Sequence, residues 1–145
     1  MTGYWELTPQ QSIDAECARR GKSALVEGCI QLIRRQKTDV ALVMALAGPA
    51  ARVVLDYDVA DEKRYWLRVW GARGLLWAWD DVAIPAIGEA LADPAWRVRE
   101  MAAKVIAKHV VGEHFDAVAA LREDSIPRVA AAATRAVTML TEREA

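Results

Sequence analysis

Three segments in the second half of the chain align with one another at a spacing of 31 residues. Residues of similar type recur at the aligned positions, which are Leu67, Val98 and Val129; Gly71, Ala102 and Ala133; Arg73, Lys104 and Arg135; and Leu75, Ile106 and Val137. A fixed period of this size is typical of helical repeat arrays, in which each unit buries its apolar face against its neighbours. Such arrays mostly serve as binding surfaces.

Local signals in the first half also predict helices. Thr8, Pro9 and Gln11 form a capping box with proline at the first helical position, so we expect a helix over 9–20 that Gly21 ends or kinks. Three further helices are expected: one capped by Ser23, one that starts at Thr38 or Asp39 and stops at Gly48, and a short one through Val53, Val54 and Leu55.

The repeats divide into two types of helix. Second-type helices are predicted at about 63–78, 95–109 and 126–140, and first-type helices at about 82–91 and 113–121. No segment alternates apolar and polar residues over the length of a strand, so the predicted fold class is all-α. We expect one domain, a short α-solenoid, in which residues 1–60 are divergent repeats or an irregular helical cap and residues 61–145 are the repeats.

Several residues of the repeat resemble the HEAT-repeat signature: Pro85 and Ile87 in a first helix, Asp93 in the turn, Val98 and Arg99 opening the second helix, and Ala102 and Ile106 along it. The resemblance implies that the turn acid and the arginine six positions later bond across neighbouring repeats and hold the register. Asp93 with Arg99 and Glu62 with Arg68 match this pattern. In the last unit Asp124 faces Ala130, which is expected of an end repeat.

The period of 31 residues is shorter than the roughly 40–47 residues usual for HEAT units. It resembles the short bacterial type, which is also found in phycobilisome lyase subunits. This likeness concerns the scaffold, and a scaffold does not carry bilin chemistry with it.

The overall charge does not favour nucleic acid or an anionic membrane as the partner, although charges sorted onto opposite faces can still create a local field. The chain has 145 residues, a net charge of −1, 54% hydrophobic residues and 27% charged residues, as expected of a globular domain. Cys17 and Cys29 lie in apolar helical sequence and indicate buried or half-buried reduced thiols. The longest apolar stretch, from Val40 to Ala47, is too short to span a bilayer, and no secretory signal pattern opens the sequence. We therefore expect a cytoplasmic protein.

Catalytic and metal-binding patterns are not found. His109 and His114 are five positions apart, a spacing that does not place two ligands on one helical face, so structural roles are favoured. The acidic segment 56–62 lacks the glycine and glutamate of a calcium loop and is expected to be a solvated loop. We expect no catalytic residue, no metal site and no cofactor.

One stripe on the second helices combines aromatic and basic residues. Trp66, Trp70, Arg73 and Trp77 recur at steps of four, three and four, so they share one helical face. Because second helices line the concave side of HEAT-like arrays, the resemblance predicts a concave binding stripe. Its predicted members are Trp66, Arg73, Trp77, Trp96, Arg97, Lys104, Lys108 and Arg135.

This stripe has two interpretations. In the first, Trp66 and Trp70 pack beneath the N-terminal helices and the basic residues keep the face soluble, since large aromatics at helical spacing are usually core. In the second, aromatic and cationic side chains form a binding groove. Both can hold in part, with Trp66 and Trp70 structural and with Trp77, Trp79, Trp96 and Arg97 exposed.

The leading hypothesis is a non-enzymatic interaction module or scaffold whose concave face binds a protein or peptide of acidic character. The alternative is a DNA-binding protein that resembles the HEAT-like alkylpurine DNA glycosylases, which use tryptophans and an aspartate; Trp77 with Asp81 is the nearest match here. Glycosylase-like or lyase-associated activity stays open under that alternative. A homodimer through the repeat ends is a further possibility, and no membrane partner is expected.

Overall fold

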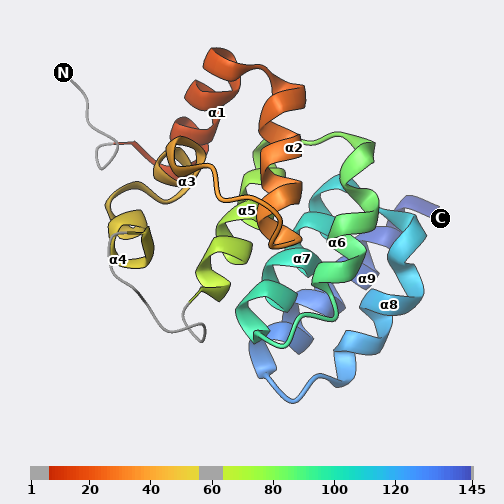
Figure 1. Cartoon of the computed structure of the whole chain (residues 1–145). Coiled ribbons are helices and arrows are strands. Elements are labelled where there is room, and N and C mark those ends of the chain that lie inside the picture. The colour runs from red at the N-terminus through yellow and green to blue at the C-terminus, as the bar shows by residue number, and fades with distance from the viewer. Residues whose placement is uncertain (1–6, 56–63, 145) are drawn as a thin grey trace. The chain divides into compact units, whose positions relative to one another are not determined.

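The computed structural model describes residues 7–55 and 64–144, and within these two ranges the regular structure is helical, with no strand (Figure 1). The prediction of an all-α fold is confirmed for these residues. The chain divides into two compact units, which we call the N-terminal unit (Met1–Ala83) and the C-terminal unit (Ile84–Ala145). The boundary between the two units lies after Ala83.

The N-terminal unit contains α1 (Pro9–Arg20), α2 (Lys22–Ile33), α3 (Val40–Ala47), α4 (Ala51–Leu55) and α5 (Tyr65–Trp77). The predicted capping box starts α1: Thr8 Oγ1 accepts from the Gln11 amide at 3.1 Å, and the Thr8 amide donates to Gln11 Oε1 at 2.9 Å. Asp39 caps α3 by accepting the Leu42 amide at 3.0 Å. These two helix starts were therefore readable from local residue types.

The junction between α1 and α2 differs from the prediction. Gly21 ends α1 with φ of 91°, a region that favours glycine, and the same residue occupies the N-cap position of α2. The helix begins at Lys22, so the expectation that Ser23 caps it is wrong. Glycine is an accepted N-cap residue, and one residue here serves as the boundary of both helices.

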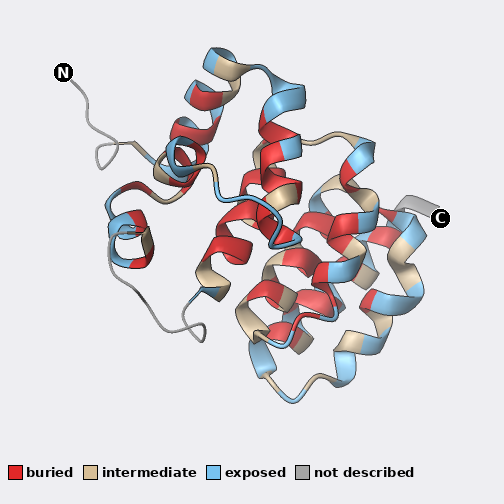
Figure 2. Ribbon diagram, in the orientation of Figure 1, coloured by how far each residue is buried: buried red, intermediate tan, exposed pale blue. Residues whose placement is uncertain are grey.

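Close packing of α5 on α2 and α3 requires two glycines. A Cβ on Gly71 would lie 2.9 Å from the Cys29 carbonyl oxygen, and a Cβ on Gly74 would lie 2.6 Å from Cys29 Sγ and 2.9 Å from Leu46 Cδ2. No side chain fits in these gaps without displacing its neighbours. Figure 2 shows the buried residues along α2 and α5, which have the most extensive contact in this unit.

The C-terminal unit contains α6 (Ile84–Ala90), α7 (Trp96–His109), α8 (Phe115–Ala120) and α9 (Pro127–Glu144). Helix α7 makes its most extensive contact with α9, and each also packs on the shorter helix that precedes it. Val98 and Ala102 on α7 are fully buried, as are Val129 and Ala133 at the positions 31 residues later on α9. The two long helices thus bury equivalent residues of the repeat.

None of the helices in the described ranges combines the length and apolar character needed to cross a bilayer.

Candidate functional site

The same turn precedes both long helices of the C-terminal unit. Asp93 Oδ1 accepts the Ala95 amide at 2.8 Å, and 31 residues later Asp124 Oδ1 accepts the Ile126 amide at 2.9 Å. This side-chain bond to the backbone two residues on fixes the chain direction just before each helix begins. The sequence period is therefore repeated as an identical local hydrogen bond.

Arg99 connects the two turns. Its Nη1 donates to the backbone carbonyls of Asp93 and Pro94 at 2.9 and 3.1 Å, and its Nε and Nη2 donate to the carboxylate of Asp124 at 2.9 and 3.2 Å. The hydrogen bonds from Arg99, with that from the Ile126 amide, outweigh the effect of burial and lower the pKa of Asp124. The side chain of Arg99 thus fixes the spacing between successive turns.

The contact between Arg99 and Asp124 is a bond between an arginine and a turn acid of neighbouring repeats. Asp124 is the acceptor for the arginine of the preceding turn, and the residue missing from the pattern is a donor at Ala130. Among the other predicted ladder residues, Asp93 and Arg68 are buried in their respective units. Glu62 and the rest of the acidic segment lie outside the described residues.

A surface rich in cations runs along α7 and α9. It consists of five residues, which we call the basic face: Arg97, Lys104, Lys108, Arg128 and Arg135. Lys108, Arg128 and Arg135 are exposed, and Arg97 and Lys104 are half-buried. Because Arg97 and Lys104 recur 31 residues later as Arg128 and Arg135, equivalent positions on the two helices carry the same charge.

Trp96 lies within the basic face at the first residue of α7. The guanidinium carbon of Arg97 is 4.4 Å from the centroid of its ring, and that of Arg128 is 5.1 Å from it. Both distances fall within the range of cation–π attraction. The indole is half-buried, so it offers part of its apolar surface together with two cations.

Glu100 is the acidic residue at the base of this surface. Its side chain is only 9% exposed, and its two carboxylate oxygens accept from Arg128 Nε at 2.8 Å and Nη2 at 2.9 Å. Lys104 Nζ lies 3.9 Å from the same carboxylate. The sequence analysis did not find Glu100, whereas Arg128 follows from the repeat as the position equivalent to Arg97.

Arg73, the predicted first member of the basic column, belongs to the N-terminal unit. It is half-buried, its Nη2 donates to the Leu46 carbonyl at 2.7 Å, and its Nε is buried without a partner. Burial lowers the pKa of this guanidinium. Arg73 therefore differs in environment from Lys104 and Arg135, and a continuous three-residue column stays a prediction.

The tryptophans of the N-terminal unit differ in how far they are buried. Trp66 stacks between Tyr65 and Trp70, with ring centroids 5.3 and 6.0 Å away, and Trp70 is 5% exposed. Trp66, Trp77 and Trp79 are half-buried. Trp70 is therefore a core residue, as the packing interpretation expects. Trp77 and Trp79, like Trp96 of the C-terminal unit, are half-buried, whereas the mixed interpretation places them on the surface.

The aspartates near the end of α5 have local partners. Asp80 Oδ1 accepts the Val82 amide at 3.0 Å, and Asp81 Oδ1 accepts the indole N–H of Trp79 at 3.1 Å. The first contact caps the short helical turn Asp81–Ala83. Asp81 is thus held by Trp79, whereas the glycosylase comparison pairs it with Trp77.

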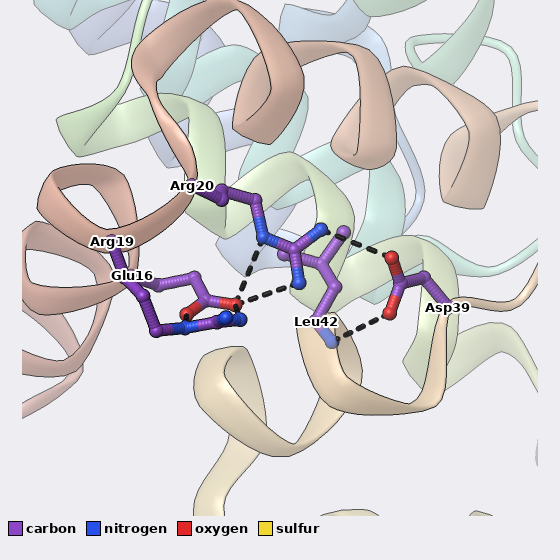
Figure 3. Close-up of polar contacts among 5 residues, drawn as sticks. All are labelled: Glu16, Arg19, Arg20, Asp39 and Leu42. Carbon is purple, nitrogen blue, oxygen red and sulfur yellow. Dashed lines mark hydrogen bonds and ion pairs between the residues drawn. The ribbon is translucent and has the colours of Figure 1, made fainter.

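One ion network in the N-terminal unit escaped the sequence analysis. The buried carboxylate of Glu16 accepts from Arg19 Nε at 2.6 Å and from Arg20 Nη2 at 2.7 Å, and Arg20 Nη1 reaches Asp39 at 3.0 Å (Figure 3). Burial alone would raise the pKa of Glu16, but the hydrogen bonds from both arginines lower it. Because Asp39 also caps α3 through Leu42, the network joins α1 to the start of α3.

His114 has a structural role. Its Nε2 donates to the Ile84 carbonyl at 2.6 Å, and a Cβ on Gly88 would lie 2.6 Å from the same nitrogen. The proton must sit on Nε2 to make this bond. Within residues 7–55 and 64–144, no three side chains of His, Cys, Asp or Glu are grouped so that they could hold a metal ion.

Comparisons of the chain with protein-family models, with curated proteins and with solved structures give no match.

Proposed function

We propose that this protein is a non-enzymatic interaction module, built as a short solenoid of HEAT-like helix pairs, that binds a protein or peptide partner on the concave face of its second-type helices. The observation that carries the proposal is the basic face on α7 and α9, where equivalent repeat positions hold Lys104 and Arg135, and Arg97 and Arg128. A surface that repeats one charge at the repeat period suits an extended partner.

Trp96 favours binding over a purely solubilising role for these charges. Solubility requires only hydrated cations, whereas here Arg97 and Arg128 both lie against a half-buried indole. Trp and Arg are the residues that most often dominate the energy of protein interfaces, because they combine large apolar area with directed hydrogen bonds. This combination supports a recognition surface at the start of α7.

The sign of the charge favours an acidic partner. Lys108, Arg128 and Arg135 are exposed cations on a chain whose net charge is −1, so the positive charge is concentrated locally. Complementary charge accelerates encounter and selects among partners.

DNA binding is the second candidate, since a basic face with an adjacent tryptophan would also attract phosphates. Two observations count against it: the net charge is slightly negative, and Asp81 is hydrogen-bonded to Trp79. A DNA-binding protein would lose retention on duplex DNA steeply as salt rises.

The test is affinity capture with the full chain as bait, from extracts of the cells that produce it. Lys104→Glu with Arg135→Glu reverses two charges of the basic face, and Lys22→Glu with Arg52→Glu reverses two exposed charges elsewhere. We expect the captured proteins to be retained by the wild type and by the Lys22 and Arg52 variant, and lost from the Lys104 and Arg135 variant. Equal capture by all three baits would contradict the proposal.

A further inference from the structure

The basic face contains an internal competitor for any acidic ligand. The carboxylate of Glu100 is almost fully buried beneath the surface and already binds Arg128 through two hydrogen bonds of 2.8 and 2.9 Å. Arg128 is nevertheless 62% exposed, so part of its guanidinium faces solvent. An incoming carboxylate would therefore meet a cation whose charge is partly neutralised from below.

Lys104 is subject to the same competition to a smaller degree. Its ammonium lies 3.9 Å from Glu100, a distance at which an exposed ion pair is weak, and its side chain is 37% exposed. Arg135 is exposed and lies one full repeat after Lys104. The charge available to a ligand thus rises along the face from Arg128 toward Lys104 and Arg135.

The spacing of the cations suits an extended segment. Arg97 and Lys108 are eleven residues apart on α7, which corresponds to about 16 Å along the helix. An extended chain advances about 3.3 Å per residue, so roughly five residues span this distance. Because successive side chains of an extended chain point to opposite sides, acidic residues at alternate positions would present carboxylates to this row about every 6.6 Å.

We propose that the basic face binds an acidic, extended segment of a protein, and that Glu100 lowers the affinity by competing with the segment's carboxylates for Arg128 and Lys104. This inference rests on the proposed function and adds the chemistry of the partner and the residue that tunes its binding.

The equivalent position in the next repeat provides a second test of the role of Glu100. Ala131 on α9 is exposed and lies 31 residues after Glu100, at the equivalent position. Glutamate there would be four residues before Arg135, the spacing at which a helical glutamate and a basic residue pair. Ala131→Glu should therefore create a second competitor, next to Arg135, without disturbing buried residues.

The experiment measures binding of fluorescein-labelled octaglutamate to the full chain by fluorescence anisotropy at near-physiological salt. We expect Glu100→Gln to tighten binding about fivefold and Ala131→Glu to weaken it about fivefold, the size of one screened charge interaction. The matched controls are Glu113→Gln, which removes an exposed acid outside the basic face, and Ala131→Gln. Both should leave the affinity nearly unchanged, and circular dichroism confirms that each variant is folded.

Three outcomes would overturn the inference: equal effects of Glu100→Gln and Glu113→Gln, no octaglutamate binding by the wild type or by Glu100→Gln, or tighter binding of duplex DNA than of octaglutamate. Failure in the first or second way leaves the proposed function standing if capture still depends on Lys104 and Arg135. If partner capture does not depend on Lys104 and Arg135, the proposed function itself is contradicted.

Discussion

Arg99 donates to both carboxylate oxygens of Asp124, a residue 25 positions further along the chain, at 2.9 and 3.2 Å. The contact joins the start of α7 to the turn before α9, and the pair of Glu100 and Arg128 joins the second turn of α7 to the first turn of α9. Neither contact can recur one repeat later, because Ala130 and Ala131 stand at the positions of Arg99 and Glu100.

We predict that Asp124→Asn lowers the free energy of unfolding by about 1–2 kcal/mol, since it removes the charge opposite Arg99 and keeps an acceptor for the Ile126 amide. Asp124→Ala also loses that acceptor and should cost about 1 kcal/mol more. Guanidinium denaturation measures both. Asp116→Asn, which changes an exposed residue of α8, is the control and should stay within about 0.5 kcal/mol of the wild type. Equal stabilities for all variants would show that the ion pair contributes nothing.

Acid should destabilise the protein. Hydrogen bonds from arginines or from backbone amides lower the pKa of Glu16, Asp39 and Asp124 in the folded state. A lowered folded pKa stabilises the protein above the unfolded pKa of about 4, and this stabilisation is lost as the pH falls through the folded pKa. Denaturation at a series of pH values should therefore show a plateau near neutrality and a fall below about pH 4, smaller in Asp124→Asn. A free energy of unfolding that rises on acidification would contradict the lowered pKa values of these carboxyl groups.

Gly88→Ala tests the contact between α6 and His114. The new Cβ would lie 2.6 Å from His114 Nε2, which must then move away from the Ile84 carbonyl. Although alanine favours a helix, we expect a loss of about 1–3 kcal/mol from this overpacking. A Cβ on Gly112 meets nothing within 4 Å, so Gly112→Ala should be neutral or slightly stabilising. Thermal melts of both variants measure the two changes in stability. The described contact is wrong if the two alanine variants behave alike.

The two cysteines should differ in reactivity. Burial raises the pKa of Cys29 to about 12, and the residue is inaccessible, whereas Cys17 is half-buried. At pH 8 the thiolate fraction of Cys29 is on the order of one in ten thousand. Iodoacetamide labelling followed by mass spectrometry should modify Cys17 first and Cys29 only after unfolding in guanidinium. Rapid native labelling of Cys29 would contradict its placement in the core.

Local signals made much of the helical structure predictable. The capping residues Thr8 and Asp39 and the boundary at Gly21 could be read from neighbouring residues, because the contacts concerned span three or four positions. The 31-residue period located α7 and α9 through their buried positions, Val98 and Val129 among them.

Long-range polar contacts were not predictable in this way. Arg20 reaches Asp39 across 19 residues, and Arg128 reaches Glu100 across 28. Neither separation is a helical spacing, and both depend on which helix faces share a boundary. The environment of Arg73 was missed for the same reason, since repeat alignment equates it with Lys104 but cannot show that its guanidinium binds Leu46.

The most direct test of the basic face is an NMR titration of the full, nitrogen-15-labelled chain with octaglutamate. We predict saturable shifts of backbone amides confined to residues 97–108 of α7 and 128–139 of α9, with the largest effects near Lys104 and Arg135. Shifts centred on the helices of the N-terminal unit, or no saturable shifts at all, would contradict the claim that this face binds acidic protein segments.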